Sequence, residues 1–334
     1  MREAAASIVV GSFESLKPGK DELRFLEKEP IPWFVLFKRN IDQDDHPSLA
    51  SSLLAPAYKA CQQETPLLVA VDQEGGRVSR LSHPFPNQGC ALRACLAPSE
   101  EQQIRDLFQY GKDVAQALLK IGINVNFAPV VDILSNPLNT GVGDRAFGTS
   151  VFPVNTRAGA FLRGMHSVGV WGCLKHFPGQ GSELSDPHNE KVIISVPKDL
   201  LLVRELEPYQ SLLHEAKMVM VSHCTFLALD SKPASLSSIV ITDLLKHHLK
   251  FDGLVLSDDM NMKAIVQDPG QWKQAIVASV AAGVNAVLVC SGLDNWARAI
   301  DALEAEGRRS ESFANLLYSS AEKMLQFRRN YLRR

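Results

Sequence analysis

The sequence predicts an α/β fold, a single (β/α)8 barrel of the TIM type, and three observations lead to this prediction. Short apolar runs alternate with longer amphipathic runs eight times along the 334 residues, a pattern typical of βαβ units and a parallel sheet. Almost every residue in the short runs is apolar, as expected of strands that are buried on both faces. A chain of this length suggests about two domains, but α/β barrels commonly reach it as one. A doubly wound sheet of similar length is the alternative.

The expected elements follow from these two kinds of run. Strands are expected at residues 7–11, 33–37, 67–72, 124–130, 172–177, 218–223, 253–258 and 286–291. Helices are expected at residues 99–121, 153–168, 198–216, 239–249 and 269–282, with a final helix at about 310–330 that covers the outside of the barrel. Since no linker or change of composition interrupts the chain, we expect one catalytic domain over residues 1–334.

Several helix ends carry start and stop signals. Ser99 precedes a helical run and Gln102 follows it by three residues, which is the spacing of a capping box. Gly122, Gly169 and Gly283 each follow a helical run, where a helix often ends on a residue with left-handed backbone. These signals support the expected boundaries.

The composition argues against several classes of partner. With 35 basic and 37 acidic residues the net charge is −2, so neither a nucleic-acid footprint nor a polybasic membrane patch is expected. Residues 1–15 lack the apolar core of a secretory signal, and no run approaches the roughly 18 apolar residues of a membrane span. The six cysteines form no Cys-x-x-Cys pair. They are expected to be structural thiols, and a reducing cytoplasm is the simplest location.

Polar side chains stand at the carboxyl ends of successive expected strands, where a barrel of this class builds its active site. The residues there are Lys38, Arg39 and Asn40, then Asp72, Gln73 and Glu74, followed by Asp132, Lys175, His176, His223, Asp258, Asp259 and Ser291. A single charged strand end is often just the start of a solvated loop. A whole series of them indicates an enzyme site, because burying such groups without a purpose is costly.

Asp72 follows the third expected strand and begins a turn that leads to Arg80. The pair Gly75-Gly76 lets the backbone turn tightly, so that Asp72 and Arg80 can both face the barrel mouth. An aspartate at the floor of a pocket can accept two hydroxyl hydrogen bonds, which suits a sugar. A turn closed by a local Asp–Arg ion pair is the alternative. Arg145, in a glycine-rich loop after the fourth strand, is interpreted as a fork donor to substrate oxygens.

Asp258 stands at the end of a fully apolar strand, where a carboxylate must be hydrogen-bonded, paired or functional. It could be a nucleophile, as in glycosidases that form a covalent glycosyl-enzyme. Asp259 is expected to point elsewhere, because consecutive strand residues face opposite sides. A metal site at the two carboxylates is the rival, although no His/Asp set at ligand spacing joins them.

The loop after the fifth expected strand carries Asp186, Pro187 and His188. Proline sets its own φ and favours extended backbone at the residue before it, so Asp186 and His188 are expected on the same side. The carboxylate can then hold one imidazole nitrogen and present the other. Because histidine titrates near neutral pH, His188 can donate a proton in one step and accept one in the next. A surface histidine with a chance neighbour is the alternative.

Seven blocks of the sequence together resemble glycoside hydrolase family 3, and within it the single-domain bacterial β-N-acetylglucosaminidases. They are WFVLFKRN at residues 33–40, DQEGGRV at 72–78, NFAPVVD at 126–132, GDRAFG at 143–148, KHFPG at 175–179, DPH at 186–188 and SDDMNM at 257–262. They span nearly the whole chain in the order of the family. The second domain of the larger family members is not expected, and the resemblance implies an enzyme without metal or cofactor.

The resemblance implies a role for each matching position. Asp258 matches the catalytic nucleophile, and His188 matches the acid/base, oriented by Asp186. The positions that hold the terminal N-acetylglucosamine are matched by Asp72, Arg80, Arg145, Lys175 and His176, and His223 and Met260 are added as substrate contacts. The resemblance also implies a cytoplasmic role in peptidoglycan recycling, with muropeptide fragments as substrates. We expect a monomer with no nucleic-acid or membrane partner.

Two positions depart from the usual family pattern. Gln180 stands where the family usually has histidine, and Pro187 stands where it usually has serine or threonine. A stiffer Asp186–His188 pair could slow the loop closure that brings the imidazole to the scissile oxygen. This would affect the rate more than the type of reaction.

The mechanistic hypothesis is retaining hydrolysis by double displacement, with Asp258 attacking the anomeric carbon while His188 protonates the leaving oxygen. Three alternatives stay open. Phosphorolysis could occur at the same site, because a neutral histidine does not repel phosphate as a carboxylate would. Lys175 could instead be a Schiff-base lysine of a barrel aldolase. The chain could also be a sugar-binding protein with impaired turnover.

Overall fold

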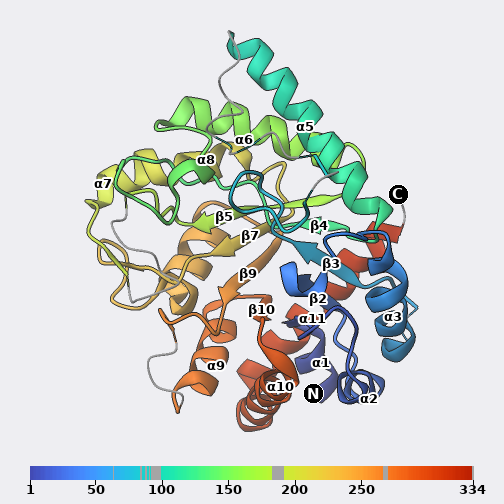
Figure 1. The fold of residues 1–334 in the computed structure, drawn as a ribbon. Helices are drawn as coiled ribbons and strands as arrows, with labels where there is room; N and C mark the ends of the chain where they lie inside the picture. Colours follow the sequence, from blue (N-terminus) through green and yellow to red (C-terminus); the bar gives the residue numbers. More distant parts are fainter. Residues whose placement is uncertain are drawn as a thin grey trace.

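A computed structural model describes residues 1–62, 64–82, 85–86, 89, 91, 99–182, 192–265 and 270–332. Within them, parallel strands close a barrel in the order β1-β10-β9-β7-β5-β4-β3-β2, with the helices arranged around it (Figure 1). The predicted (β/α)8 barrel is confirmed. The doubly wound alternative is wrong, because the main sheet closes on itself and has no open edge.

All eight predicted strands are present, and most are shorter than the sequence indicates. They are β1 (Val9–Gly11), β2 (Trp33–Leu36), β3 (Leu68–Val71), β4 (Val125–Asn126), β5 (Trp171–Phe177), β7 (Met218–Val221), β9 (Leu254–Asp259) and β10 (Ala286–Val289). Two further short strands, β6 (Ile193–Ile194) and β8 (Thr225–Phe226), pair with each other outside the barrel. The predicted strands are too long mainly at their carboxyl ends, where the chain leaves the sheet to form the site.

The helices include several that the apolar pattern did not indicate. The longer ones are α2 (Lys20–Lys28), α5 (Glu100–Lys120), α6 (Val151–His166), α9 (Trp272–Ala282), α10 (Gly292–Arg309) and α11 (Glu311–Leu332), and the shorter ones are α1 (Arg2–Ser7), α3 (Ala55–Cys61), α7 (Lys198–Leu200) and α8 (Glu207–Leu212). Wider π turns occupy Ala50–Leu54, Leu201–Glu205 and Ile239–His248, and 3-10 turns occupy Lys38–Asn40, Gly143–Arg145 and Ala234–Leu236. The helix expected at 198–216 is interrupted near Pro208, which has no backbone N–H to continue the helical ladder.

The helix-end signals are mostly confirmed. The Ser99 side chain accepts a hydrogen bond from Gln102 N at 3.2 Å and so caps α5. The reciprocal half of the predicted capping box is wrong, because the Gln102 side chain donates to Asp106 instead. The three glycines predicted to end helices, Gly122, Gly169 and Gly283, have positive φ values of 85°, 92° and 113°.

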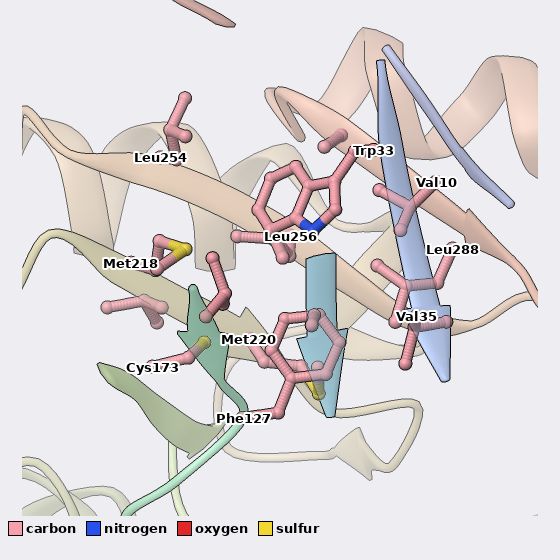
Figure 2. Close-up of a cluster of buried hydrophobic side chains, with 14 of the residues drawn as sticks. Val10, Trp33, Val35, Phe127, Cys173, Met218, Met220, Leu254, Leu256 and Leu288 are labelled. Carbon is pink, nitrogen blue, oxygen red and sulfur yellow. The ribbon is translucent and has the colours of Figure 1, made fainter. Parts of the chain in front are cut away.

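Alternate strand positions fill the interior of the barrel. Trp33 and Val35 of β2 and Met218 and Met220 of β7 lie in one buried cluster (Figure 2). Residues two apart on a strand point to the same side, so they stack in layers along the barrel axis. The layer nearest the carboxyl ends, which includes Val35, Met220 and Leu288, forms the floor of a cavity. The apolar core therefore also shapes the candidate site.

The described cysteines agree with the prediction of structural thiols. Cys61, Cys173, Cys224 and Cys290 are buried and form no disulfide among the described residues, and burial raises the pKa of the Cys61 thiol to about 12. Cys90 and Cys95 lie outside the described residues. None of the helices within the described ranges combines the length and the apolar character that spanning a bilayer requires.

Candidate active site

A cavity of about 370 Å³ lies at the carboxyl ends of the barrel strands. Its wall holds the charged and histidine side chains of Asp72, Arg77, Arg80, Arg145, Lys175, His176, Asp258 and Asp259. Its floor is apolar and includes Val35, Phe127, Met220 and Leu288. A larger cavity of about 730 Å³ lies near α1 and α11, but it collects none of the predicted site residues. The smaller cavity is therefore the candidate site.

Six of the ten predicted site residues line this cavity, namely Asp72, Arg80, Arg145, Lys175, His176 and Asp258. They come from the ends of β3, β5 and β9 and from the loops that follow β3 and β4. Asp186 and His188 lie outside the described residues, as does Pro187. The predicted acid/base pair and its reach to Asp258 therefore stay predictions.

The structure places His223 and Met260 behind the wall of the cavity. His223 is buried, with Nδ1 2.7 Å from Ser235 Oγ and Nε2 3.0 Å from the carbonyl oxygen of Asp259. Met260 N donates to Leu288 O, and the Met260 side chain is fully buried in the core. Neither side chain is among the described residues that line the cavity, so a direct sugar contact is not supported for either.

Met262 lines the cavity in the place expected for Met260. After β9 the chain makes a turn in which Met262 N donates to Asp259 O at 2.9 Å. This turn carries the chain back over the barrel mouth. The sequence could not distinguish the two methionines, because strand periodicity ends at the turn.

Asp72 is held by two cations in the cavity wall. Its Oδ1 accepts from Lys175 Nζ at 2.8 Å and its Oδ2 accepts from Arg80 Nη2 at 3.1 Å. Burial alone would raise the pKa of this carboxyl, but Lys175 and Arg80 outweigh burial and lower it. The local Asp–Arg ion pair considered as an alternative does form, and it forms inside the cavity. An ionised carboxylate keeps further lone pairs on both oxygens for substrate hydroxyls.

Glu74 is a member of the same charge cluster that the sequence left without a role. Its carboxylate lies 2.6 Å from Lys175 Nζ and accepts two hydrogen bonds of 2.8 Å from Arg145. Burial would raise its pKa, but Arg145 and Lys175 outweigh this and lower the pKa to about 2. The sequence signal was its position close behind Asp72 at the end of an apolar run, where a barrel builds its site.

The sequence predicted that Arg145 offers its guanidinium fork to substrate oxygens, but in the structure most of that fork is already hydrogen-bonded within the protein. Its Nε and Nη2 edge is occupied by Glu74, and Nη1 donates to Gly141 O at 3.1 Å. The guanidinium still lines the cavity, and its Nη2 lies 3.4 Å from His176 Nε2. Only its remaining N–H groups are therefore available to a substrate.

Arg77, at the rim of the cavity, is bonded to the glycine-rich loop that carries Arg145. It forms an ion pair of 2.8 Å with Asp144 and donates to Thr140 O and Gly141 O at 2.8 and 2.9 Å. These bonds tie the turn after β3 to the glycine-rich loop that carries Arg145. The sequence assigned Arg77 no role, because its partners are distant in the chain.

Lys175 is placed as a permanent cation rather than as a nucleophile. Burial would lower the pKa of this ammonium, but Asp72 and Glu74 outweigh burial and raise it. A Schiff base requires the neutral amine, which such neighbours disfavour. The two carboxylate neighbours of Lys175 therefore disfavour the aldolase alternative.

His176 is oriented by Asp132 from the loop after β4. Its Nδ1 lies 2.7 Å from Asp132 Oδ2. A carboxylate only accepts, so Nδ1 donates to Asp132, and Nε2 faces the cavity and Arg145 Nη2, which can only donate. The neighbouring Asp132 Oδ1 accepts from Gln180 N at 2.9 Å.

Gln180 connects the loop after β5 to the end of β7. Its buried side chain accepts a hydrogen bond from Ser222 Oγ at 2.9 Å through Oε1. Its backbone carbonyl accepts from Asn139 Nδ2 at 2.8 Å. The departure from the usual histidine therefore leaves a hydrogen-bonded residue at this position, with a neutral amide in place of a titratable ring.

Two irregularities in the barrel explain why consecutive residues share the cavity. The pairing of β5 with β7 shifts between Lys175 and Phe177, and the pairing of β10 with β9 shifts between Ala286 and Leu288. An extra residue in a ladder breaks the strict alternation of sides. Lys175 and His176 can therefore both line the cavity, as can the two residues that end β9.

Asp259 corrects one prediction, since it lines the cavity beside Asp258 instead of pointing elsewhere. Its Oδ1 accepts from Asn261 Nδ2 at 2.8 Å and from Cys290 N at 3.2 Å, so it serves the local turn. Asp258 Oδ1 accepts from Asp259 N at 2.8 Å. Among the described residues, no group of three or more His, Cys, Asp or Glu side chains is placed to hold a metal ion.

A comparison with known protein families identifies the family of this fold. The family model described as the glycosyl hydrolase family 3 N terminal domain matches residues 6–316. The chain belongs to glycosyl hydrolase family 3. This confirms the resemblance inferred from the seven sequence blocks and makes the chain a member of a family of glycoside hydrolases.

Two relatives of this chain are named as β-hexosaminidases. The β-hexosaminidase LpqI of Mycobacterium tuberculosis is 39% identical over 230 residues, 67% of this chain and 58% of LpqI. The β-hexosaminidase of Pasteurella multocida is 31% identical over 290 residues, covering 85% of this chain and 80% of that protein.

A solved family 3 β-N-acetylglucosaminidase from Paenibacillus superposes with a TM-score of 0.88 at 29% identity, covering 99% of this chain and 63% of that one. The chain thus spans less than two thirds of LpqI and of the Paenibacillus enzyme. The agreement over nearly the whole of this chain confirms the fold of the family.

Proposed function

We propose that this family 3 member is a retaining β-N-acetylglucosaminidase that releases terminal, non-reducing N-acetylglucosamine from muropeptide fragments of peptidoglycan. The observation that carries the proposal is that Asp258 lines the same cavity as Asp72, Lys175 and His176. A candidate nucleophile and a set of hydroxyl-binding groups thus share one small space. The names of the relatives support the reaction and the sugar.

The sugar ring would rest on the apolar floor, with its hydroxyls toward the charge cluster. Asp72 would accept hydroxyl hydrogen bonds, and Lys175 and Arg145 would donate to ring substituents. Such charge-assisted bonds are stronger than those between neutral groups, and they orient the ring. This arrangement would bring the anomeric carbon within reach of Asp258.

The proposed reaction has two displacement steps. In the first, an Asp258 oxygen bonds to the anomeric carbon, the glycosidic C–O bond breaks, and His188 gives its proton to the leaving oxygen. In the second, His188 takes a proton from water, the hydroxide oxygen bonds to the anomeric carbon, and the ester to Asp258 breaks. Asp186 would hold the imidazole in both steps. Each proton is carried by a side chain of the protein.

The proposal also includes the setting of the enzyme. We propose that residues 1–334 form one catalytic domain that acts as a monomer in the cytoplasm, without a cofactor. The resemblance to the recycling enzymes of the family supports the location and the muropeptide substrate. The two displacement steps support the absence of a cofactor, since they use carboxylate and imidazole groups alone.

Turnover of paired nitrophenyl substrates tests the proposal. The wild type should release nitrophenol from the N-acetylglucosaminide faster than from the glucoside, and Asp258→Asn should lose at least about 1000-fold in kcat. A slow fluorinated substrate should label Asp258. Asp259→Asn is the matched control and should still be labelled. A label on another residue, or an active Asp258→Asn, would refute the nucleophile.

The same assay distinguishes hydrolysis from the phosphorolysis alternative. Adding phosphate should leave the sugar product as free N-acetylglucosamine. If sugar 1-phosphate appears instead, the enzyme is a phosphorylase with the same nucleophile. Binding of the N-acetylglucosaminide without any turnover would support the sugar-binding alternative.

A further inference from the structure

We propose that Glu74 is a positioning residue of the sugar site, which aims Arg145 and Lys175 at the substrate without touching it. The inference rests on the proposed function, because it takes these two cations as sugar contacts. Glu74 lies just behind the described residues that line the cavity, whereas both of its partners are among them. It would therefore act through Arg145 and Lys175.

The carboxylate of Glu74 makes three charge-assisted contacts. Its Oε2 accepts from Arg145 Nε at 2.8 Å, and its Oε1 accepts from Arg145 Nη2 at 2.8 Å. The same Oε1 lies 2.6 Å from Lys175 Nζ. A bidentate pair fixes the plane of the guanidinium as well as its position. One carboxylate thus sets the direction of two cations from different parts of the chain.

The backbone holds Glu74 itself in a rigid turn. Glu74 N donates to Val78 O at 3.0 Å, and Gly75 follows with a φ of 100°. A Cβ at Gly75 would lie 2.7 Å from Gly89 O and 2.8 Å from Tyr110 Oη. The backbone that carries Glu74 is therefore closely packed and tied by a hydrogen bond. The position of Glu74 is therefore preorganised.

The charge balance of the cluster explains why a second carboxylate is needed. Three cations, Arg80, Arg145 and Lys175, meet only two carboxylates, Asp72 and Glu74, in this network of ion pairs. Without Glu74 the guanidinium of Arg145 would lose its only carboxylate partner among the described residues. Lys175 would then be held by Asp72 alone, which would turn that carboxylate further from the sugar hydroxyls.

Glu74→Gln tests the inference because it keeps the shape of the side chain and replaces one acceptor oxygen with an N–H donor. That donor would face the N–H groups of Arg145. We expect KM for the nitrophenyl N-acetylglucosaminide to rise at least about tenfold, while kcat falls less than about threefold. Loss of contacts made equally in the ground state and transition state acts on KM.

A double-mutant cycle separates positioning from a merely structural role. If Glu74 acts through Arg145 and Lys175, then adding Glu74→Gln to Arg145→Gln should raise KM by no more than about threefold, because only the contact with Lys175 remains to be lost. The control Glu215→Gln also removes a carboxylate from an arginine, Arg163, but away from the cavity, and its KM should change less than about twofold.

Several outcomes would overturn the inference. An unchanged KM in Glu74→Gln, or additive effects in the double variant, would do so. If Glu74→Gln fails to fold, the comparison of the double variant with Arg145→Gln decides, because neither of these proteins has an unpaired guanidinium at this position. A wild type that turns over no N-acetylglucosaminide would refute the proposed function, whereas an active wild type with an equally active Glu74→Gln would refute only the role of Glu74.

Discussion

His176 Nδ1 lies 2.7 Å from Asp132 Oδ2, so a carboxylate from the loop after β4 orients the imidazole at the end of β5. Asp132 is buried, and its other oxygen accepts from the backbone of Gln180. The pair joins two neighbouring barrel strands and determines which imidazole nitrogen carries the proton. The lone pair of Nε2 is left toward the cavity. Whether His176 offers a donor or an acceptor to the cavity therefore depends on Asp132, which does not line the cavity.

Asp132→Asn should lower kcat/KM by about tenfold to 100-fold. The amide can present an N–H to Nδ1 of His176, which favours the tautomer with the proton on Nε2. That proton would point at Arg145 and present a donor where the site now has an acceptor. Steady-state kinetics measure the change. Asp230→Asn, which alters a carboxylate bonded to Ser237 outside the cavity, should keep wild-type kinetics. If the two variants had equal kcat/KM, the tautomer of His176 would have no effect on catalysis.

Gln180→Ala should slow the enzyme more than it weakens substrate binding. The variant loses the hydrogen bond to Ser222 that connects the loop after β5 to the end of β7. This loop leads toward the sequence positions of Asp186 and His188. We expect kcat to fall about tenfold and the free energy of unfolding to fall by about 2 kcal/mol. Gln109→Ala, on the exposed face of α5, is the control. A loss of stability with full kcat would contradict the link to catalysis.

Gly181→Ala should impair catalysis through the backbone. A Cβ at Gly181 would lie 1.7 Å from Ile133 O, so the chain must shift close to where it leads on to residues 183–191. We expect kcat to fall at least about tenfold, because small displacements of catalytic groups are costly. At Gly169, φ is 92° and nothing lies within 4 Å of an added Cβ. Gly169→Ala should therefore cost about 1 kcal/mol of stability and leave kcat unchanged. Equal kcat values in the two variants would contradict this prediction.

Glu205 should make stability depend on pH. Burial raises the pKa of this carboxyl from 4.5 to about 7, against the opposing effect of Arg204. The folded protein therefore binds this proton more tightly than the unfolded chain. The stabilisation is complete below pH 4.5 and is lost as the pH rises through about 7. At about 1.4 kcal/mol per pKa unit, the full loss is on the order of 3 kcal/mol.

Thermal unfolding between pH 5 and 8 measures this contribution. Glu205→Gln keeps an acceptor for Arg204 and has no proton to lose, so its melting temperature should fall less with rising pH than that of the wild type. Glu101→Gln, at an exposed position on α5, should keep the wild-type slope. Identical slopes in Glu205→Gln and the wild type would mean that another group causes the pH dependence.

The sequence by itself predicted the barrel, because both faces of each parallel strand are buried and every strand must then be almost entirely apolar. The same logic located Asp72, Lys175, His176 and Asp258, since a polar residue that ends such a run must stand at the barrel mouth. The helices α1, α2, α3 and α10 escaped prediction. In none of these four helices does the N-cap side chain accept a hydrogen bond, whereas Ser99 caps the first turn of α5.

The tertiary structure decided which polar residues meet and which point away. Glu74 and Arg145 are 71 positions apart, and their pairing arises only when the loops after β3 and β4 come together. Met260 lies in the core and Met262 lines the cavity, because β9 ends at Asp259 and the chain then turns, with Met262 N donating to Asp259 O. Two shifts in strand pairing let consecutive residues share one side. Local sequence carries the period of a strand, but irregularities in pairing and contacts between distant loops depend on the closed barrel.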